Sequence, residues 1–289
     1  MTGRSDRPHI VQFPHPGGEH RPPGAAMDWN RGPHQRKFLR ATGTYIDAGR
    51  VQRGPITFWG EWEPQSRVVE SYPPGLRDGP RWLHEPWWEV PRHRRLLQNT
   101  DPLVFGDRFR YSNCRQTRNA ALRDLAPGSL VLFGSALRGA FALDTVFVVA
   151  RPGVDYLRGA PDHLDIPEWV RSVVFDPLRS TEDRVDEALR LYEGARHADD
   201  PSVPYSFVPC LPYVPGGEAF APPLIELDGR WLTPRLAMGA RATEATPDDV
   251  RNAWATVVDQ VLAARLCLGV ALDVPPSEPP ARPALEGPA

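Results

Sequence analysis

The stretch "CRQTRNAALRDLAPGSLVLFGS", residues 114–135, carries the clearest secondary-structure pattern in the chain. Ala121, Leu122 and Leu125 recur at helical spacing, which predicts a short amphipathic helix over 115–125. The following Pro-Gly pair predicts a turn, and the apolar run 129–135 predicts a buried strand. The stretch therefore predicts a helix and a strand joined by a tight turn, with many polar side chains where the helix begins.

Working outward, apolar and β-branched runs predict further strands at 55–63, 140–150 and 170–176, and a hairpin at 223–233. The strongest helix pattern begins at Thr246, a natural N-cap before Pro247, and we expect the helix to end at Gly269. Strands and helices are both present, so the sequence predicts an α+β fold with a long C-terminal helix.

Composition sets the expected domain organisation. The chain has 289 residues, 41% of them hydrophobic, and its 34 prolines and 24 glycines indicate many loops and short elements. Residues 1–26 are rich in Pro and Gly and predict an N-terminal arm. Residues 27–270 are expected to form one domain with insertions, and the Pro-rich residues 271–289 a disordered tail.

Charge and cysteine content favour a reduced, aqueous compartment. No apolar run approaches the roughly 20 residues of a membrane helix, and the first residues lack the apolar core of a secretory signal. Cys114, Cys210 and Cys267 are far apart and form no CxxC pair, which is typical of a cytoplasmic protein. We expect no membrane partner. Residues 1–124 are basic and the remainder acidic, which favours a face that binds an anion.

The run from Cys114 to Val149 resembles the EVE branch of the PUA-like superfamily, whose relatives include the ASCH and YTH domains. In that family a segment with Arg and Asn enters a helix, a strand follows a glycine turn, and the next strand ends in two valines. The counterparts here are "RQTRNAALRDL", "APGSLVLFGS" and "AFALDTVFVV", with Ser129 where the family usually has Asp. The resemblance implies a small PUA-like β-barrel with packed helices.

The resemblance also implies a pocket that holds a single base, modified or unmodified, on aromatic side chains. Stacking and hydrogen bonds to the base edge must offset the few kcal/mol lost when a base leaves its stack. Trp59 and Trp62 are the candidate platforms. The candidate base and phosphate contacts are Asn113, Arg115, Gln116, Arg118 and Asn119 near the expected helix start, with Arg36 and Lys37 in the basic stretch 34–40.

Each of these residues also has a plainer interpretation. Tryptophans are mostly core residues, and two that lie three apart in a strand face opposite sides, so at most one of Trp59 and Trp62 can enter a given pocket. An arginine such as Arg118 on a helix surface is commonly solvated or ion-paired. Glu61 and Glu63 share one strand face, which is typical of the solvated side of an edge strand and sometimes of an acid–base pair.

A cluster of histidines near the N-terminus supports an alternative. His15, Glu19, His20 and His34 offer the nitrogen and oxygen ligands that zinc and manganese take. Their spacing, H-x-x-x-E-H, differs from the zinc peptidase motifs, and the intervening Pro-Gly-Gly excludes a shared helical face. Without a metal, His20, His34 and Glu19 are candidates for acid–base catalysis on a phosphate ester. Structural hydrogen bonds of loop histidines are a further interpretation.

The sequence has no P-loop, Rossmann glycine fingerprint, Gly-x-Ser-x-Gly elbow or kinase signature, and we expect no cofactor. The leading hypothesis is a cytoplasmic nucleic-acid-binding protein that recognises a base of DNA or RNA. The alternative is a metal-dependent or histidine acid–base enzyme that acts on nucleotide or nucleic-acid phosphates. A third reading is an interaction protein that docks a partner through the Trp-rich stretch 81–90.

Overall fold

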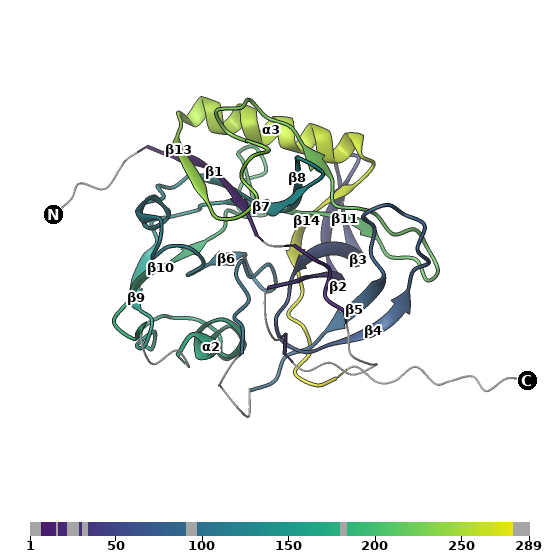
Figure 1. The fold of residues 1–289 in the computed structure, drawn as a ribbon, viewed down its shortest axis with the longest axis horizontal. Coiled ribbons are helices and arrows are strands. Elements are labelled where there is room, and N and C mark those ends of the chain that lie inside the picture. The colour runs from purple at the N-terminus through teal and green to yellow at the C-terminus, as the bar shows by residue number, and fades with distance from the viewer. Residues whose placement is uncertain are drawn as a thin grey trace, which may run out of the picture.

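The computed structural model describes residues 7–15, 17–21, 29–30, 34–90, 97–179 and 184–279. The chain is mostly β, with 38% of its residues in strands and 13% in helices. Three sheets and one helix of several turns make up its frame (Figure 1).

A five-stranded sheet runs in the order β12–β8–β7–β1–β13. Its strands are β1 (His9–Pro14), β7 (Leu130–Leu137), β8 (Ala140–Val148), β12 (Leu224–Ile225) and β13 (Arg241–Glu244). β1 pairs in parallel with β7, from Ile10 opposite Leu130 to Pro14 opposite Gly134, and antiparallel with β13. Every residue of β1 is buried, because the strand has neighbours on both edges and packed layers on both faces.

A six-stranded sheet runs in the order β14–β11–β3–β2–β5–β4. Its strands are β2 (Arg36–Asp47), β3 (Arg50–Glu61), β4 (Ser66–Ser71), β5 (Trp82–Pro86), β11 (Val208–Pro212) and β14 (Cys267–Leu272). β14 also pairs with β2, so β2, β3, β11 and β14 close into a barrel. The β2–β3 hairpin turns at Ala48 and Gly49, which have φ angles of 47° and 76°, as a two-residue hairpin loop requires.

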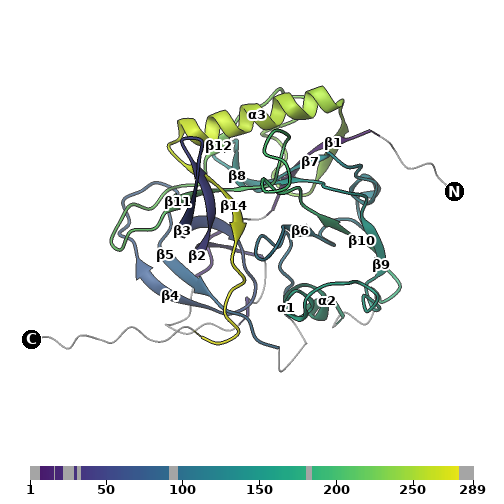
Figure 2. The same ribbon diagram turned by 180° about the vertical axis from the view of Figure 1, so that it is seen from behind.

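The third sheet has the order β6–β10–β9 and comprises β6 (Arg110–Tyr111), β9 (Val154–Leu157) and β10 (Ala188–Glu193). The short helical segments are a 3₁₀ turn (Ala120–Arg123), α1 (Glu168–Val170), a π-helical segment (Arg171–Phe175) and α2 (Asp176–Arg179). Figures 1 and 2 place α1 and α2 at the opposite end of the molecule from α3 (Pro247–Ala263). None of the described helices is long and apolar enough to cross a membrane.

Helix α3 covers the five-stranded sheet. Its N-cap, Thr246, accepts a hydrogen bond from the Asp249 backbone N–H, and the Asp249 side chain accepts one from the Thr246 N–H. The buried side chains of α3 are Val250, Ala253, Val257 and Val261. They pack in one apolar cluster with strand residues of the five-stranded sheet, so α3 closes that face of the sheet.

The expected α+β class, with a PUA-like barrel, packed helices and a long C-terminal helix, is wrong. The chain is mostly β. The helix that begins after Thr246 ends at Ala263, short of the expected end at Gly269, and residues 267–272 return to the barrel as a strand. The helical period of apolar residues ends at Leu266, and the apolar residues from Cys267 onward belong to β14, which pairs with β2 and β11.

The helix expected over 115–125 is also wrong. Residues 114–118 form turns, and only Ala120–Arg123 is helical, as a 3₁₀ turn. The Asp101 carboxylate accepts hydrogen bonds from the N–H groups of residues 112, 113 and 114, and Arg115 has a φ of 62°. A remote carboxylate thus draws the backbone away from a helix, and no helix N-terminus exists there to bind a phosphate.

Two further element predictions are wrong. Residues 170–176, expected as a strand, form helical turns whose apolar side chains pack in the main core. Tertiary burial overrides the β-propensity of Val and Phe there. In the expected hairpin 223–233, Asp228 O accepts hydrogen bonds from the N–H groups of Trp231 and Leu232, so the turn forms, but only Leu224–Ile225 is a strand.

The expected arm over residues 1–26 contains β1, so residues 9–14 are a central strand of the five-stranded sheet. At the other end, β14 reaches Leu272, and Pro276 O accepts a hydrogen bond from the Trp88 N–H. Residues 1–6 and 280–289 lie outside the described residues. In the Trp-rich stretch 81–90, Trp87 is buried.

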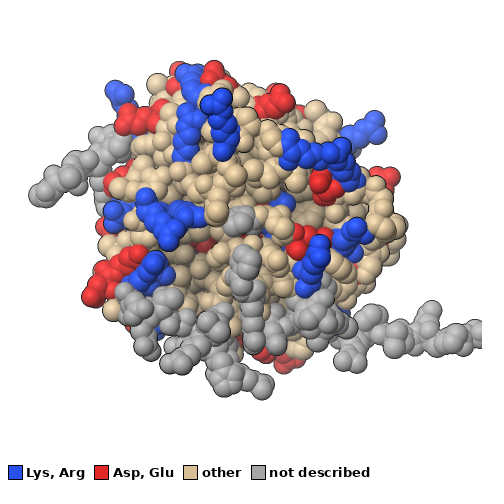
Figure 3. Space-filling model, in the orientation of Figure 1, with Lys and Arg blue, Asp and Glu red and all other residues tan. Residues whose placement is uncertain are grey.

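The charge asymmetry of the sequence does not produce a single basic face in the view of Figure 3. Lys and Arg side chains lie there beside Asp and Glu side chains across the surface. Many charged side chains of the described residues are paired, as Arg40 and Arg67 are with Glu85.

Candidate metal centre

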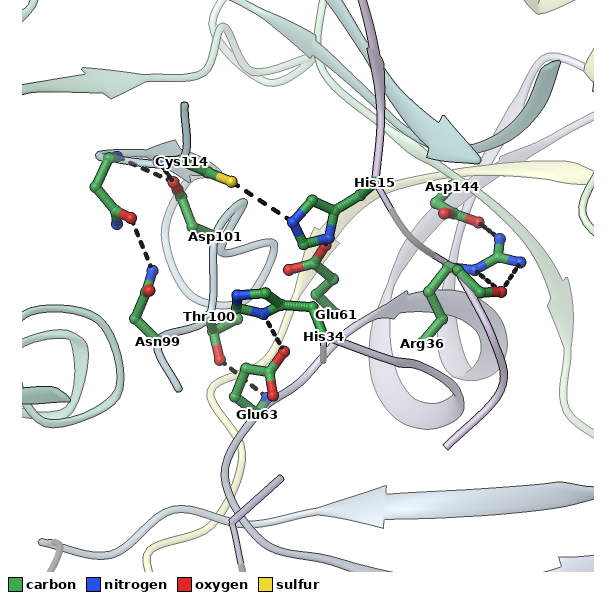
Figure 4. Close-up of polar contacts among 12 residues, drawn as sticks. His15, His34, Arg36, Glu61, Glu63, Asn99, Thr100, Asp101, Cys114 and Asp144 are labelled. Atoms are coloured by element: carbon green, nitrogen blue, oxygen red, sulfur yellow. Dashed lines mark hydrogen bonds and ion pairs between the residues drawn. The ribbon is translucent and has the colours of Figure 1, made fainter. Parts of the chain in front are cut away.

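The ends of three strands bring one polar cluster together. His15 directly follows β1, and its backbone N–H donates to Gly134 O in β7 at 2.7 Å. His34 lies two residues before β2, and Glu61 is the last residue of β3. Figure 4 shows the two imidazole rings on either side of the Glu61 carboxylate.

His15, His34 and Glu61 have the geometry of a metal-binding set. One nitrogen or oxygen from each lies within 4.8 Å of the others, and the two imidazole centroids are 4.8 Å apart. His15 Nδ1 forms an ion pair with Glu61 Oε1. His15 and Glu61 are buried, and His34 is partly exposed. Two imidazoles and one carboxylate are the ligand set of several catalytic zinc sites.

Glu63 fixes the orientation of His34. Glu63 is fully buried, its Oε1 lies 2.8 Å from His34 Nδ1, and its backbone N–H donates to Thr100 Oγ1 at 3.1 Å. With Nδ1 engaged, Nε2 of His34 remains free of hydrogen bonds to the described residues. A carboxylate behind a histidine in this way is the usual outer partner of a metal-ligating imidazole.

Four carboxyl groups, those of Glu61, Glu63, Asp101 and Asp144, are buried in and around the cluster. Burial raises the pKa of Glu63, and the charge of Glu61 adds to the shift. Burial likewise raises the pKa of Asp101 and of Asp144 to about 6, again with a contribution from Glu61. Oε2 of Glu61 and Oε2 of Glu63 have no hydrogen-bond partner among the described residues. Such a group of carboxylates favours a bound cation.

Cys114 lies on the turn beside this cluster. Asp101 Oδ2 accepts the Cys114 backbone N–H at 2.6 Å, and Cys114 Sγ is 3.5 Å from His15 Nε2. Burial raises the pKa of the Cys114 thiol, although His15 opposes the shift. For His15, burial opposes the charged form, but Glu61 and Cys114 outweigh it and raise the His15 pKa well above its ordinary value.

A cavity of about 290 Å³ opens onto the cluster. Its lining includes His15, His34, Asp101 and Cys114. Four arginines also line it: Arg115, Arg118, Arg158 and Arg184. Two of the candidate ligands, His15 and His34, are therefore reachable by a small polar molecule.

Only two of the four metal ligands expected from the sequence come together in the structure. His15 and His34 meet, but Glu19 and His20 lie elsewhere. Glu19 Oε1 accepts the backbone N–H groups of Arg81 and Trp82, at 2.7 and 3.2 Å. His20 Nδ1 is 3.1 Å from Gln35 Oε1, and burial, with help from Lys37, lowers the His20 pKa to about 4. Neither residue is among those that line the cavity.

Arg36 and Lys37 are not surface contacts for phosphate. Arg36 is buried, pairs with Asp144 at 2.6 Å and donates to Gly17 O. Lys37 is fully buried and donates to Pro64 O at 3.0 Å. Both side chains point into the protein because they start β2 between packed layers.

Trp59 and Trp62 are core residues and not base platforms. Trp62 is fully buried and its Nε1 donates to Gln65 O at 2.8 Å. Trp59 packs on Phe38, and its Nε1 donates to Phe220 O at 2.8 Å. Both indole N–H groups thus have partners inside the protein.

The expected base and phosphate contacts divide into two groups. Asn113, Arg115 and Arg118 line the cavity. The amide of Gln116 is buried and pairs with the backbone N–H and C=O of Arg190, and Asn119 Nδ2 donates to Ala240 O. The last two side chains hold the turn and do not face the cavity.

Sequence reasoning missed Asp101, Cys114 and the buried state of Glu61 and Glu63. The acidic alternation at the end of a strongly apolar strand, "FWGEWEP", is the signal that could have found the two glutamates. No family model, no curated protein and no solved structure matches the chain. Function therefore has to be argued from the site.

Proposed function

We propose that the chain is a metal-dependent hydrolase whose divalent cation, zinc or manganese, is held by His15, His34 and Glu61. The observation that carries this proposal is the convergence of the three side chains within 4.8 Å, with two of them, His15 and His34, lining an open cavity. Three protein ligands beside an accessible space are typical of catalytic sites, which keep one position for water or substrate. A bound cation lowers the pKa of its water and so supplies a nucleophile at neutral pH.

The neighbouring residues have positioning roles in this proposal. Glu63 holds the His34 ring so that Nε2 is the nitrogen left for a cation. Asp101 accepts three backbone N–H groups and holds the turn that carries Cys114 along the cavity wall.

Calorimetric titration of the chelator-treated protein with zinc and with manganese tests the proposal. We expect one ion per chain. His34→Ala should abolish tight binding, and Glu63→Gln should weaken it about 10- to 100-fold. The matched controls, His163→Ala and Glu226→Gln, alter exposed side chains and should bind as the natural protein does. Hydrolysis of p-nitrophenyl acetate and p-nitrophenyl phosphate should be lost with the metal and return with it. Failure of both ions to bind would refute the proposal.

A second candidate function rests on one further observation. Cys114 Sγ, His15 and Glu61 follow one another in the order of a cysteine hydrolase relay, with 3.5 Å between Sγ and His15 Nε2. The Cys114 N–H, a natural donor to an oxyanion, is however already bound to Asp101. Cys114→Ala separates the two candidates, because it removes a thiol mechanism entirely and leaves a metal-dependent one in place.

Recognition of a base in DNA or RNA stays a prediction from the sequence, as does a cytoplasmic location. The amide and guanidinium groups of Asn113, Arg115 and Arg118 at the cavity support base recognition. The imidazoles of His15 and His34 are the aromatic rings among the residues that line it. Binding of single-stranded and duplex oligonucleotides at several salt concentrations tests it, and a protein that binds none at 50 mM salt does not have this function.

A further inference from the structure

Four arginines line the same cavity as the candidate metal ligands His15 and His34. Arg115 and Arg118 come from the turn after β6, Arg158 follows β9, and Arg184 lies shortly before β10. These guanidiniums, far apart in sequence, line the same space of about 290 Å³. A cavity that is lined by two candidate metal ligands and by several guanidiniums is suited to an anion.

Two of the four arginines are held in place by one carboxylate. Arg158 Nε donates to Glu187 Oε2 at 2.7 Å, and Arg184 Nη1 lies 3.9 Å from Glu187 Oε1. Glu187 therefore balances part of their charge and fixes the Arg158 side chain.

The other two have no carboxylate partner among the residues that the structure describes. Within the described part of the chain, the side chains of Arg115 and Arg118 form no ion pair, and the backbone N–H of Arg118 donates to Arg115 O at 3.0 Å. The φ of 62° at Arg115 belongs to a turn that places both residues along the cavity. Two guanidiniums are thus left to bind a ligand.

We infer that the substrate is a phosphate ester, with its phosphoryl oxygens held by Arg115 and Arg118; this inference rests on the proposed hydrolase function. A carboxylate has two oxygens, which a single arginine fork can satisfy. A phosphoryl group presents more oxygens and up to two negative charges, and it matches guanidiniums that approach from several segments. A single phosphoryl group does not fill the cavity, so part of the alcohol portion enters as well.

The reaction is hydrolysis of a P–O bond. The hydroxide half of a water molecule forms the new bond to phosphorus, and the bond from phosphorus to the ester oxygen breaks. The leaving oxygen keeps the electron pair of that bond and receives the remaining proton of the water. An alcohol and inorganic phosphate are the products, with no oxidant or further reactant.

The test compares Arg115→Gln/Arg118→Gln with Arg77→Gln, a control at an exposed arginine. Inorganic phosphate is titrated into each protein loaded with one equivalent of zinc, and acetate serves as the carboxylate probe. We expect phosphate to bind more tightly than acetate, and at least about tenfold more weakly to the double variant, because charge-assisted hydrogen bonds are lost. With p-nitrophenyl phosphate, KM should rise by a similar factor while kcat changes little.

The outcomes separate this inference from the proposed function. Zinc that binds normally to the double variant confirms that its site is folded. If that protein also binds phosphate as the natural one does, or if acetate binds as tightly as phosphate, the phosphate ester assignment is wrong and the hydrolase remains. If neither the natural protein nor any variant binds zinc or manganese, the proposed hydrolase function itself is wrong.

Discussion

Lys37 is the single lysine of the chain, and it is fully buried. Its Nζ donates to Pro64 O at 3.0 Å, and burial lowers the Lys37 pKa to about 7, with Glu63 acting in the opposite direction. An ammonium group is a point charge whose desolvation is costly, and the fold leaves it one described hydrogen bond. The residue is therefore expected to lose its proton near neutral pH.

Because no other lysine is present, NMR of protein labelled only at lysine reports this titration directly. We expect a midpoint near pH 7 in place of 10.5. Below the folded pKa the amine is charged in both states, and folding carries the full cost of burial. Between about 7 and 10.5 the unfolded chain binds more protons, so Lys37 makes stability rise with pH. Lys37→Met should therefore gain stability over the natural protein at pH 6, and less at pH 9, by urea unfolding. An equal gain at both pH values would contradict the assigned pKa.

At the residue scale, the sequence predicted which types of residue form the site, but not which of the candidates come together in the fold. His15 and His34 were predicted as ligands and do meet, while Glu19 and His20, equally plausible by type, are used for backbone and core contacts. Spacing within a loop of Pro and Gly does not say which side chains turn inward. The sequence likewise predicts an exposed Arg36, because its partner Asp144 lies 108 positions away in the chain.

Gly134 links two elements to the site. The pairing of β7 with β8 shifts register between Phe133 and Gly134, and the Gly134 C=O accepts the backbone N–H of His15. A Cβ at Gly134 would lie 2.0 Å from Ala142 O and 2.8 Å from the Phe141 ring. Only a residue without a side chain lets β8 approach this closely.

Gly134→Ala should therefore lower the free energy of unfolding by about 1–3 kcal/mol, because neither the strand backbone nor a buried ring can move aside easily. It should also weaken zinc binding, since the bulge positions His15. Gly54→Ala is the matched control, because a Cβ at Gly54 meets nothing within 4 Å. Urea unfolding and zinc titration measure both effects. Equal stability of the two variants would show that β8 can yield at this position.

At the element scale, patterns that depend on local contacts were read correctly. Strands are confirmed within the predicted ranges 55–63, 129–135 and 140–150, where β3, β7 and β8 lie, and Thr246 is confirmed as an N-cap. The helix over 115–125 failed because Asp101 holds the backbone N–H groups of residues 112–114 in a turn directly before it. The strand over 170–176 failed because burial against the main core decides its conformation. Both errors come from partners distant in sequence.

The candidate site lies where separate layers of the molecule meet. His15 extends from the five-stranded sheet, whereas His34 and Glu61 flank barrel strands. The buried pair of Arg36 in β2 with Asp144 in β8 already joins the two sheets at 2.6 Å. A cation bound by the three candidate ligands would add a further link between them, and no single stretch of sequence contains that link.

Metal binding should therefore stabilise the whole molecule. A cation that binds the folded chain alone raises its free energy of unfolding by about 2.7 kcal/mol when free metal is 100 times Kd. We expect chelator-treated protein to melt several degrees lower than protein given zinc, with the five-stranded sheet and the barrel unfolding together. His34→Ala should remove the zinc-dependent rise, because a pair of ligands holds the ion far more weakly than three. His163→Ala, at an exposed histidine, should keep it. A rise of equal size in His34→Ala would mean that zinc binds elsewhere on the chain and that the three residues are held together by their own ion pair.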